Sequence, residues 1–476
     1  MLRHLVAALL LAASGNARLS PFSARFPTRV PPMLENSGDP GEALFLTPYI
    51  KSGQLDKARA LSRVGPLPSP PPTSPLSYSG FLTVNEKYDS NMFFWFFPAL
   101  ERPDAAPVLL WLQGGPGGSS LYGLFCEHGP FVVDAALRLQ PRDVAWTRHY
   151  SVLYVDNPVG TGFSFTRHDA GYARTQRDVA ADLYEALRQF FTLFSDFRAR
   201  DFYVTGESYA GKYVPAIAYV IDQRNPSADT HINLKGVAIG DGLCDPVTMF
   251  GYADLLYQVA LADERQREHV RVRTDAAVAL ITRKLYRDAF LVFDALLNGD
   301  LTPYPSYFYN ITGSTNYFNY LLSTADDDDA HFYGYLALPA TRRAVHVGAL
   351  PFNNGTIVEQ HLVDDMMQSV KPWVAHIMDR YKVLMYSGQL DIIVAATLTE
   401  NFLWSVEWRH QRDYHRADRT WWRVNPNDTE IAGYARQVEQ FYQVVIRGGG
   451  HMLPHDQPER TLDMLNRFIT DSGFSN

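Results

Sequence analysis

Apolar residues recur along the chain in two alternating patterns, one typical of strands and one typical of helices. Short runs rich in aromatic and β-branched residues, bounded by glycine and proline, predict buried strands at residues 92–97, 108–112, 202–205, 236–239, 382–386 and 443–446. Apolar residues spaced by three or four positions predict an amphipathic helix between Thr175 and Ser195, with further helices at 210–221 and 458–469. Because strands alternate with helices, we expect an α/β protein with a mostly parallel central sheet.

Two regions depart from this alternation. Residues 18–76 hold many prolines and few periodic apolar positions, and the sequence GPLPSPPPTSP at 65–75 favours polyproline II backbone, so we expect an N-terminal extension with a proline-rich linker. Residues 245–371 are charged, tyrosine-rich and helix-forming, which predicts an inserted helical lid. The core would then consist of residues 77–244 and 372–476.

The first 17 residues have the pattern of a signal peptide, with Arg3 and His4 before a short apolar stretch and small residues up to Ala17. No later apolar stretch approaches the ~18 residues that span a bilayer, so we expect a soluble chain in the secretory pathway, secreted or lysosomal. Three N-x-T sequons, consistent with glycosylation in that compartment, lie at Asn310, Asn354 and Asn427.

Composition and charge exclude several other classes of protein. The 476 residues are 46% hydrophobic and 20% charged, which gives ample material for a core. The net charge of −8 provides no positive field for nucleic acid. Only two cysteines are present, Cys126 and Cys244, and whether they pair stays open. The acidic run at 326–329 lacks the spaced ligands of a calcium loop, so we expect a solvated loop, and we expect no metal or cofactor.

A strand, a tight turn and a helix with small residues at its start surround Ser208 in the sequence FYVTGESYAG (202–211). This is typical of a nucleophile elbow, in which Gly206 and Ala210 leave room for close backbone packing, although Ala210 departs from the regular G-x-S-x-G pattern. The helix N-terminus would stabilise a developing oxyanion. The alternative is a serine that only caps the helix.

A glycine-rich loop follows the strand at 108–112, in the sequence QGGPGGSS (113–120). In an α/β-hydrolase, the oxyanion hole takes one backbone N–H from the residue after the nucleophile, here Tyr209, and one from such a loop, here Gly115. A phosphate cradle is the alternative, but no G-x-x-x-x-G-K-S/T pattern is present, so nucleotide binding is disfavoured.

A carboxylate and an imidazole follow two later strands, in the order Ser, acid, His that this fold uses. Asp391 ends the turn SGQLD after the strand at 382–386, and His451 ends the loop RGGGH after the strand at 443–446. Asp391 would orient His451, which would accept the proton of the Ser208 hydroxyl. His455 is the nearest competitor, but its place just before the last helix favours a capping role.

Four segments together resemble the signature blocks of the serine carboxypeptidase family: WLQGGPGGSS (111–120), GESYAGKYVP (206–215), SGQLDIIV (387–394) and GGGHMLPHDQP (448–458). Gln113 and Gly118, where most members have Asn and Cys, are similar to the vitellogenic-like carboxypeptidases, as is LFLTPYI at 44–50. The resemblance implies an α/β-hydrolase with a helical insertion, which removes the last residue of peptides, often at acidic pH.

The same resemblance implies that Gln113, Glu127 and Glu207 bind the α-carboxylate of the substrate. Two adjacent carboxyl groups that share a proton can donate to a carboxylate, so acid would favour binding. A surface pair of glutamates with ordinary titration is the alternative. The absence of cysteine at Gly118 and throughout 245–371 implies a looser lid.

We therefore expect a serine carboxypeptidase that acts through an acyl-enzyme on the C-termini of peptides or proteins. An acyltransferase of the same fold and a non-catalytic binding or protective protein are the alternatives. The preferred terminal residue and the oligomeric state, including a homodimer, stay open.

Overall fold

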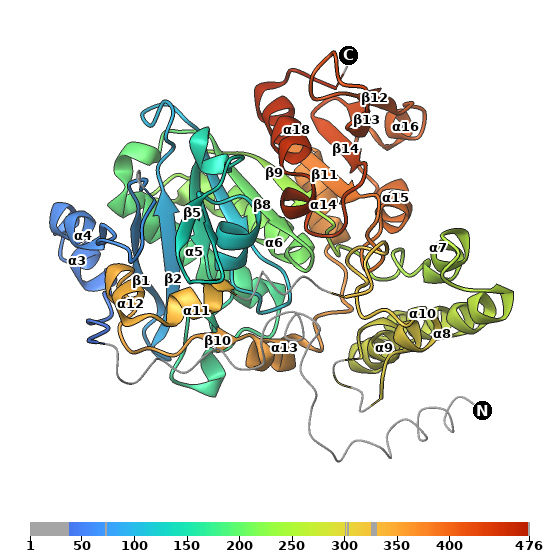
Figure 1. Ribbon diagram of the computed structural model, residues 1–476, viewed down its shortest axis with the longest axis horizontal. Coiled ribbons are helices and arrows are strands. Elements are labelled where there is room, and N and C mark those ends of the chain that lie inside the picture. The colour runs from blue at the N-terminus through green and yellow to red at the C-terminus, as the bar shows by residue number, and fades with distance from the viewer. Residues whose placement is uncertain (1–37, 72–73, 300, 302–303, 325–330, 475–476) are drawn as a thin grey trace.

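The computed structural model describes residues 38–71, 74–299, 301, 304–324 and 331–474 (Figure 1). The expected signal peptide and the acidic run at 326–329 lie outside the described residues. A ten-stranded sheet runs through the molecule in the order β1-β2-β6-β3-β8-β9-β11-β14-β13-β12.

Six neighbouring strands at the centre of the sheet are parallel, which confirms the predicted α/β class with a mostly parallel sheet. They are β6 (Ser151–Val155), β3 (Val108–Leu112), β8 (Phe202–Glu207), β9 (Leu234–Gly240), β11 (Lys382–Gly388) and β14 (Phe441–Ile446). Antiparallel strands extend both edges: β1 (Tyr78–Asn85) and β2 (Ser90–Phe97) at one, β13 (Gly433–Val438) and β12 (Thr420–Trp422) at the other. The parallel strands therefore bring their carboxyl ends to one edge of the sheet.

The predicted amphipathic helices pack against this sheet. In α5 (Gln176–Leu193), Thr175 and Asp178 form a capping box, and the apolar face at Val179, Leu183 and Leu187 is buried. The helix α6 (Ala210–Arg224) packs against α5, β8 and β9, and α18 (Pro458–Thr470) packs beside β14. Further helices are α14 (Lys371–Met378), α15 (Ala396–Trp404), α16 (Gln411–Tyr414) and α17 (Leu453–Asp456).

The proline-rich extension is more ordered than its sequence predicts. Residues 38–71 contain two short helices, α3 (Thr47–Lys51) and α4 (Leu55–Ser62), instead of a linker alone. The backbone N–H of Leu46 donates to the Phe81 carbonyl over 2.9 Å, and both Leu46 and Ala58 are fully buried. The extension therefore forms part of the core at the β1 edge, because a few apolar anchors are enough to hold it there.

The insertion at 245–371 occupies two places instead of forming one lid. Its first part, α7 (Tyr252–Gln258), α8 (Glu264–Thr282), α9 (Tyr286–Phe293) and α10 (Tyr307–Thr312), forms the helical group at the right of Figure 1. Its second part, α11 (His331–Ala337) and α12 (Pro339–Ala344), lies beside β1 and β2. There Ser79 Oγ donates to the Val345 carbonyl over 2.8 Å, and the Gly65 N–H donates to the Ala344 carbonyl over 3.0 Å.

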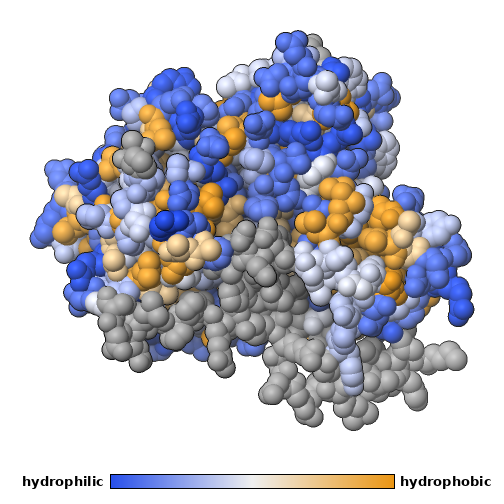
Figure 2. All heavy atoms as spheres, in the orientation of Figure 1, coloured by the Kyte–Doolittle hydropathy of each residue, from blue (hydrophilic) through white to orange (hydrophobic). Residues whose placement is uncertain are grey.

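Between α12 and the core, β10 (Asn353–Asn354) pairs with β7 (Thr161–Gly162), and α13 (Thr356–Leu362) follows. A second small hairpin, β4 (Phe131–Val133) with β5 (Leu139–Pro141), follows the glycine-rich loop. Figure 2 shows apolar side chains gathered over the first part of the insertion. The exposed large apolar residues of the whole insertion include Val272, Leu285, Leu321 and Leu322. No helix in the described part of the chain is long and apolar enough to cross a membrane.

Candidate active site

Ser208 sits in a sharp turn between β8 and α6. Its φ of +64° lies in the left-handed region, which is uncommon for a residue other than glycine and is typical of a nucleophile elbow. Close packing explains the small residues beside it, because a Cβ atom on Gly206 would lie 2.5 Å from the Leu112 carbonyl oxygen and 2.8 Å from the Ala210 Cβ. The Ser208 N–H donates to the Gly240 carbonyl over 2.9 Å, so β9 holds the turn from the other side.

The glycine-rich loop packs directly against this turn. A Cβ atom on Gly114 would lie 2.6 Å from both the Ser208 Cβ and the Tyr209 backbone nitrogen, so only glycine fits there. Gly115, with a φ of +120°, lines a cavity of about 50 Å³ together with Ser208 and Tyr209. The two predicted oxyanion donors therefore line the same cavity as the serine.

His451 and Asp391 form a buried pair at the ends of β14 and β11. Asp391 Oδ2 lies 2.8 Å from His451 Nδ1, and neither side chain is exposed. The carboxylate of Asp391 also accepts the backbone N–H groups of Ile393 over 2.9 Å and Val394 over 3.2 Å. His451 Nε2 has no hydrogen-bond partner among the described residues, so no hydrogen bond joins it to the Ser208 hydroxyl.

Because Asp391 engages Nδ1, Nε2 is the imidazole nitrogen that remains available to accept a proton. Hydrogen bonds between a nucleophile and its base are often long before substrate binds, so an open Nε2 is compatible with a role as base. His455, the competing histidine, instead lies 3.0 Å from Asp456 Oδ1 and is partly exposed. Asp391 therefore pairs with His451.

The three residues predicted to bind a carboxylate form one buried cluster. Gln113 Nε2 donates to Glu207 Oε1 over 2.7 Å, and Trp111 Nε1 donates to Gln113 Oε1 over 2.9 Å, which fixes the orientation of the amide. Burial, and then the charge of Glu207, raise the pKa of Glu127 well above its ordinary value. All three side chains have 0% exposure, so the alternative of a surface pair is wrong.

A helical turn carries Glu127 into this cluster. Residues Gly123–Glu127 form a π-helical turn, and a Cβ atom on Gly123 would lie 2.2 Å from Trp111 Nε1. The turn can approach the end of β3 this closely only because Gly123 has no side chain. The indole that orients Gln113 therefore also sets the position of the segment that ends in Glu127.

Sequence reasoning missed two buried acids near the site. Asp241, which follows β9, offers an oxygen within 4.8 Å of an oxygen of Asp391 and a nitrogen of His451. Such a donor set can hold a metal ion, but one nitrogen of His451 is already engaged by Asp391. Asp156 accepts from Ser119 Oγ over 2.5 Å and from the Phe163 N–H over 2.9 Å, and burial raises its pKa to about 7.

Sequence reasoning also missed a buried ion pair that links the helix after Ser208 to residues beside the cavity that contains Ser208. Lys212 Nζ lies 2.9 Å from Asp365 Oδ2 in a buried ion pair, and the Tyr209 hydroxyl donates to the same oxygen over 3.0 Å. Met366, the next residue, lines the cavity that contains Ser208. Each of these acids left a weak signal in the sequence. Asp241 is followed by glycine after the strand at 236–239, and Asp156 begins the sequence Asp-Asn-Pro after an apolar run. Asp365 could have been sought as the partner of Lys212, the lysine in the elbow motif.

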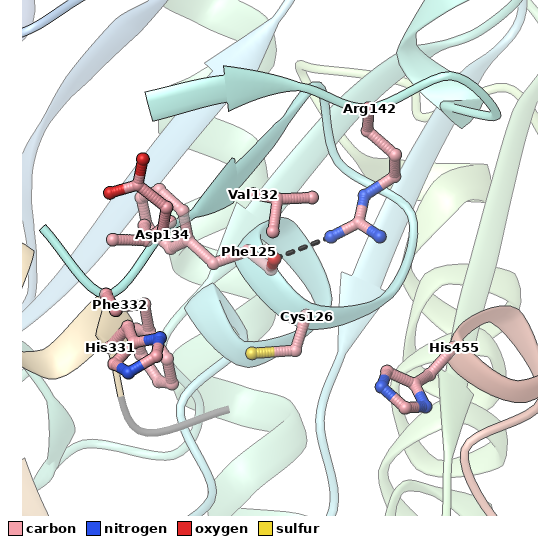
Figure 3. A pocket seen from close by; sticks show the side chains of 10 residues that line it. Phe125, Cys126, Val132, Asp134, Arg142, His331, Phe332 and His455 are labelled. Atoms are coloured by element: carbon pink, nitrogen blue, oxygen red, sulfur yellow. Dashed lines mark hydrogen bonds between the residues drawn. The ribbon is translucent and has the colours of Figure 1, made fainter. Parts of the chain in front are cut away.

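A larger cavity of about 440 Å³ adjoins the carboxylate cluster (Figure 3). Its lining includes Cys126, which precedes Glu127 in the chain, and His455, whose charge acts on Glu127. Figure 3 shows Phe332 and His331 on the opposite side of Cys126 from His455. The cavity thus lies beside the acids and at a different place from the cavity that contains Ser208.

Comparisons with known proteins show the family of this chain. A family model described as serine carboxypeptidase matches residues 68–471. The chain belongs to the serine carboxypeptidase family. Its α/β-hydrolase core and its serine-type carboxypeptidase class follow from that membership.

Two relatives and one solved structure illustrate the match. The human protein named "Probable serine carboxypeptidase CPVL" is 54% identical over 438 residues, which cover 92% of this chain and 91% of the relative. The vitellogenic carboxypeptidase of Aedes aegypti is 41% identical over 435 residues, with 90% of each chain covered, which confirms the predicted subgroup. The crystal structure of Kex1(delta)p, a prohormone-processing carboxypeptidase from Saccharomyces cerevisiae, shares the fold at a TM-score of 0.77 and 20% identity, covering 87% of this chain and 96% of Kex1(delta)p.

The cysteines and sequons have clear positions in the structure. Cys126 and Cys244 are both buried and form no disulfide with each other, and Cys244 Sγ donates to the Gly211 carbonyl over 3.2 Å. The asparagines of the three predicted sequons, at 310, 354 and 427, are all exposed. Glycosylation at these positions stays a prediction.

Proposed function

We propose that Ser208, His451 and Asp391 cleave the last peptide bond of peptide or protein substrates through an acyl-enzyme. His451 Nε2 accepts the proton of the Ser208 hydroxyl as its oxygen attacks the carbonyl carbon, and it then donates that proton to the leaving amine. The backbone N–H groups of Gly115 and Tyr209 stabilise the oxyanion. The buried pair of Asp391 and His451, with Nε2 left open, is the observation that carries this proposal.

Gln113, Glu127 and Glu207 bind the free α-carboxylate in this proposal. The raised pKa of Glu127 keeps a proton on the glutamate pair under acidic conditions, and that proton forms a charge-assisted hydrogen bond to the substrate. As the pH rises through this pKa, the pair becomes fully ionised and repels the carboxylate. Activity on peptides with a free C-terminus is therefore favoured at acidic pH.

The two cavities lie on the two sides of the scissile bond in this proposal. The cavity at Ser208 takes the side chain that precedes the bond, and its walls at Leu243, Phe250, Tyr252, Phe290 and Phe293 favour an apolar one. The larger cavity beside Glu127 takes the side chain of the departing terminal residue. The leader pattern and the exposed sequons support a place in the secretory pathway, secreted or lysosomal.

The proposal is tested with a peptide and its C-terminal amide. The wild-type protein is expected to release one residue from the free acid at pH 5 and to act much more slowly on the amide. Ser208→Ala should abolish release, while Ser195→Ala, at an exposed serine, should leave it unchanged. Equal rates on acid and amide would refute carboxylate recognition, and activity in Ser208→Ala would refute the triad.

Product analysis also separates hydrolysis from acyl transfer. An acyl-enzyme can be intercepted by nucleophiles other than water. If added alcohols or amines compete with water at millimolar concentration, the acyltransferase alternative gains support. If the free acid is the main product, the result supports hydrolysis.

A further inference from the structure

Asp241 is a buried acid whose side chain has no role in the chemistry described so far. It follows β9. In the sheet, β9 lies between β8, the strand that leads to Ser208, and β11, the strand that leads to Asp391. Its N–H donates to the Tyr386 carbonyl over 2.8 Å, and it has 0% exposure. Its φ of +42° is left-handed, a conformation that clusters at functional sites when the residue is not glycine. The backbone therefore holds this side chain in a fixed place beside the Asp391–His451 pair.

The two acids differ in the number of donors that reach them. The carboxylate of Asp391 accepts three hydrogen bonds, from the N–H groups of residues 393 and 394 and from His451 Nδ1. Asp241 accepts one, from the Gly388 N–H to Oδ1 over 2.9 Å, and its Oδ2 has no donor among the described residues. A buried carboxylate oxygen without a donor is costly, whereas a protonated oxygen can itself donate.

The surroundings of Asp241 also disfavour a second negative charge. The titratable groups that face it are Asp391 and Tyr386 from β11 and its following turn, Glu207 from β8, and His451 after β14. Burial, and then the charge of Asp391, raise the pKa of Asp241 well above its ordinary value. Two adjacent carboxyl groups in a dry site share one negative charge, and the donor count assigns that charge to Asp391.

We propose that Asp241 is a neutral carboxylic acid whose Oδ2–H donates to Asp391, making it a positioning residue for the Asp391–His451 pair. It would hold the Asp391 carboxylate in the plane that receives His451 Nδ1–H and would keep the net charge next to the imidazole at −1. The proposal rests on the proposed function only for its effect on turnover, since the proton on Asp241 is a property of the resting protein.

Two substitutions separate this role from a purely structural one. Asp241→Ala removes the donor and is expected to lower kcat by ~10- to 100-fold, the effect of one hydrogen bond to a charged group, with little change in KM. Asp241→Asn keeps a donor and an acceptor and is neutral at every pH, so it should restore most of the lost turnover. Equal kcat in the wild-type and Asp241→Ala proteins would overturn the proposal.

The protonation state is tested by the pH dependence of Ser208 labelling with a neutral fluorophosphonate, which reports the pKa of His451 without involving the carboxylate cluster. If Asp241 is already neutral, Asp241→Asn leaves the midpoint in place. If Asp241 is ionised, the substitution removes a charge near the imidazole and lowers the midpoint by ~1–2 pH units, which would overturn the proposal.

Infrared difference spectra give a readout that needs no activity. The spectrum of wild type minus Asp241→Asn should contain the C=O stretch of one protonated carboxyl group. Its absence would overturn the proposal, even if Asp241→Ala failed to fold. An inactive wild-type enzyme that still shows this band would refute the proposed function and leave the assignment of Asp241 intact.

Discussion

Replacing Gln113 by leucine tests the carboxylate cluster most specifically. Gln113 belongs to this cluster and has no proposed role in the proton transfers or in the oxyanion hole. The substitution removes the 2.7 Å hydrogen bond to Glu207 and leaves Trp111 Nε1 without its acceptor. Leucine has a volume similar to that of glutamine, and the site is fully buried, so the substitution leaves little empty space and costs little stability through a cavity. The perturbation is thus confined to polar contacts.

The size of the effect follows from the contacts that are lost. A hydrogen bond to a charged group contributes ~1.5–3 kcal/mol, and each ~1.4 kcal/mol is tenfold in rate. In Gln113→Leu, kcat/KM on a peptide with a free C-terminus should therefore fall by ~10- to 100-fold. On the matching peptide amide or ester, which lacks the carboxylate, it should change by less than ~3-fold, because no charged group depends on the cluster.

The assay compares kcat/KM on both substrates for the wild-type protein, Gln113→Leu and Gln113→Asn. The asparagine variant restores an amide on a shorter stem, so it should recover part of the loss on the free acid. Thermal unfolding in parallel shows whether the leucine variant is folded. An equal loss on the free acid and the amide would refute the assignment of Gln113 to carboxylate binding.

Three further outcomes are expected. Gly114→Ala should lower kcat by ~100-fold while the protein stays folded, because its Cβ would lie 2.6 Å from Ser208 Cβ and displace the turn, and a misplacement of ~1 Å can cost that much in rate. An active variant would contradict the packing at the elbow. The raised pKa of Asp156, about 7, contributes stability that is fully present below its unfolded pKa and is lost as the pH rises to about 7, by at most ~4 kcal/mol in all. About 3 kcal/mol of this loss falls between pH 5 and pH 8, so denaturant unfolding at these two pH values should show it, and Asp156→Asn should reduce it. Thiol titration of the denatured, unreduced protein should find two thiol groups, those of Cys126 and Cys244, and a value of zero would contradict the structure.

The elbow and the pair of Asp391 and His451 could be predicted from sequence because each signal is local. A strand, a tight turn and small residues follow one another within 202–211, and the same is true where β11 and β14 end. Parallel strands bring those ends together, so the chain order alone indicated that residues 391 and 451 meet. The buried glutamates came from the family resemblance, since nothing local to Glu127 predicts its burial.

The parts that were missed depend on contacts between distant segments. Leu46 is buried because it pairs with Phe81, and the second part of the insertion lies beside β1 because Val345 accepts a hydrogen bond from Ser79, 266 residues away. Neither contact leaves a periodic pattern in the sequence. The strand β6 contains the apolar run SVLYV, from which it could have been predicted. The strand β12 is only three residues long, and β13 contains the polar residues Arg436 and Gln437.

Trapping the acyl-enzyme tests the central claim most directly. The protein is mixed with an activated ester of a blocked amino acid at low pH, quenched in acid within the burst phase, digested and mapped by mass spectrometry. The account predicts one acyl group on the peptide that contains Ser208, and no acyl group in His451→Ala. An acyl group on another residue, or turnover with no acylated peptide in a burst-phase quench, would contradict it.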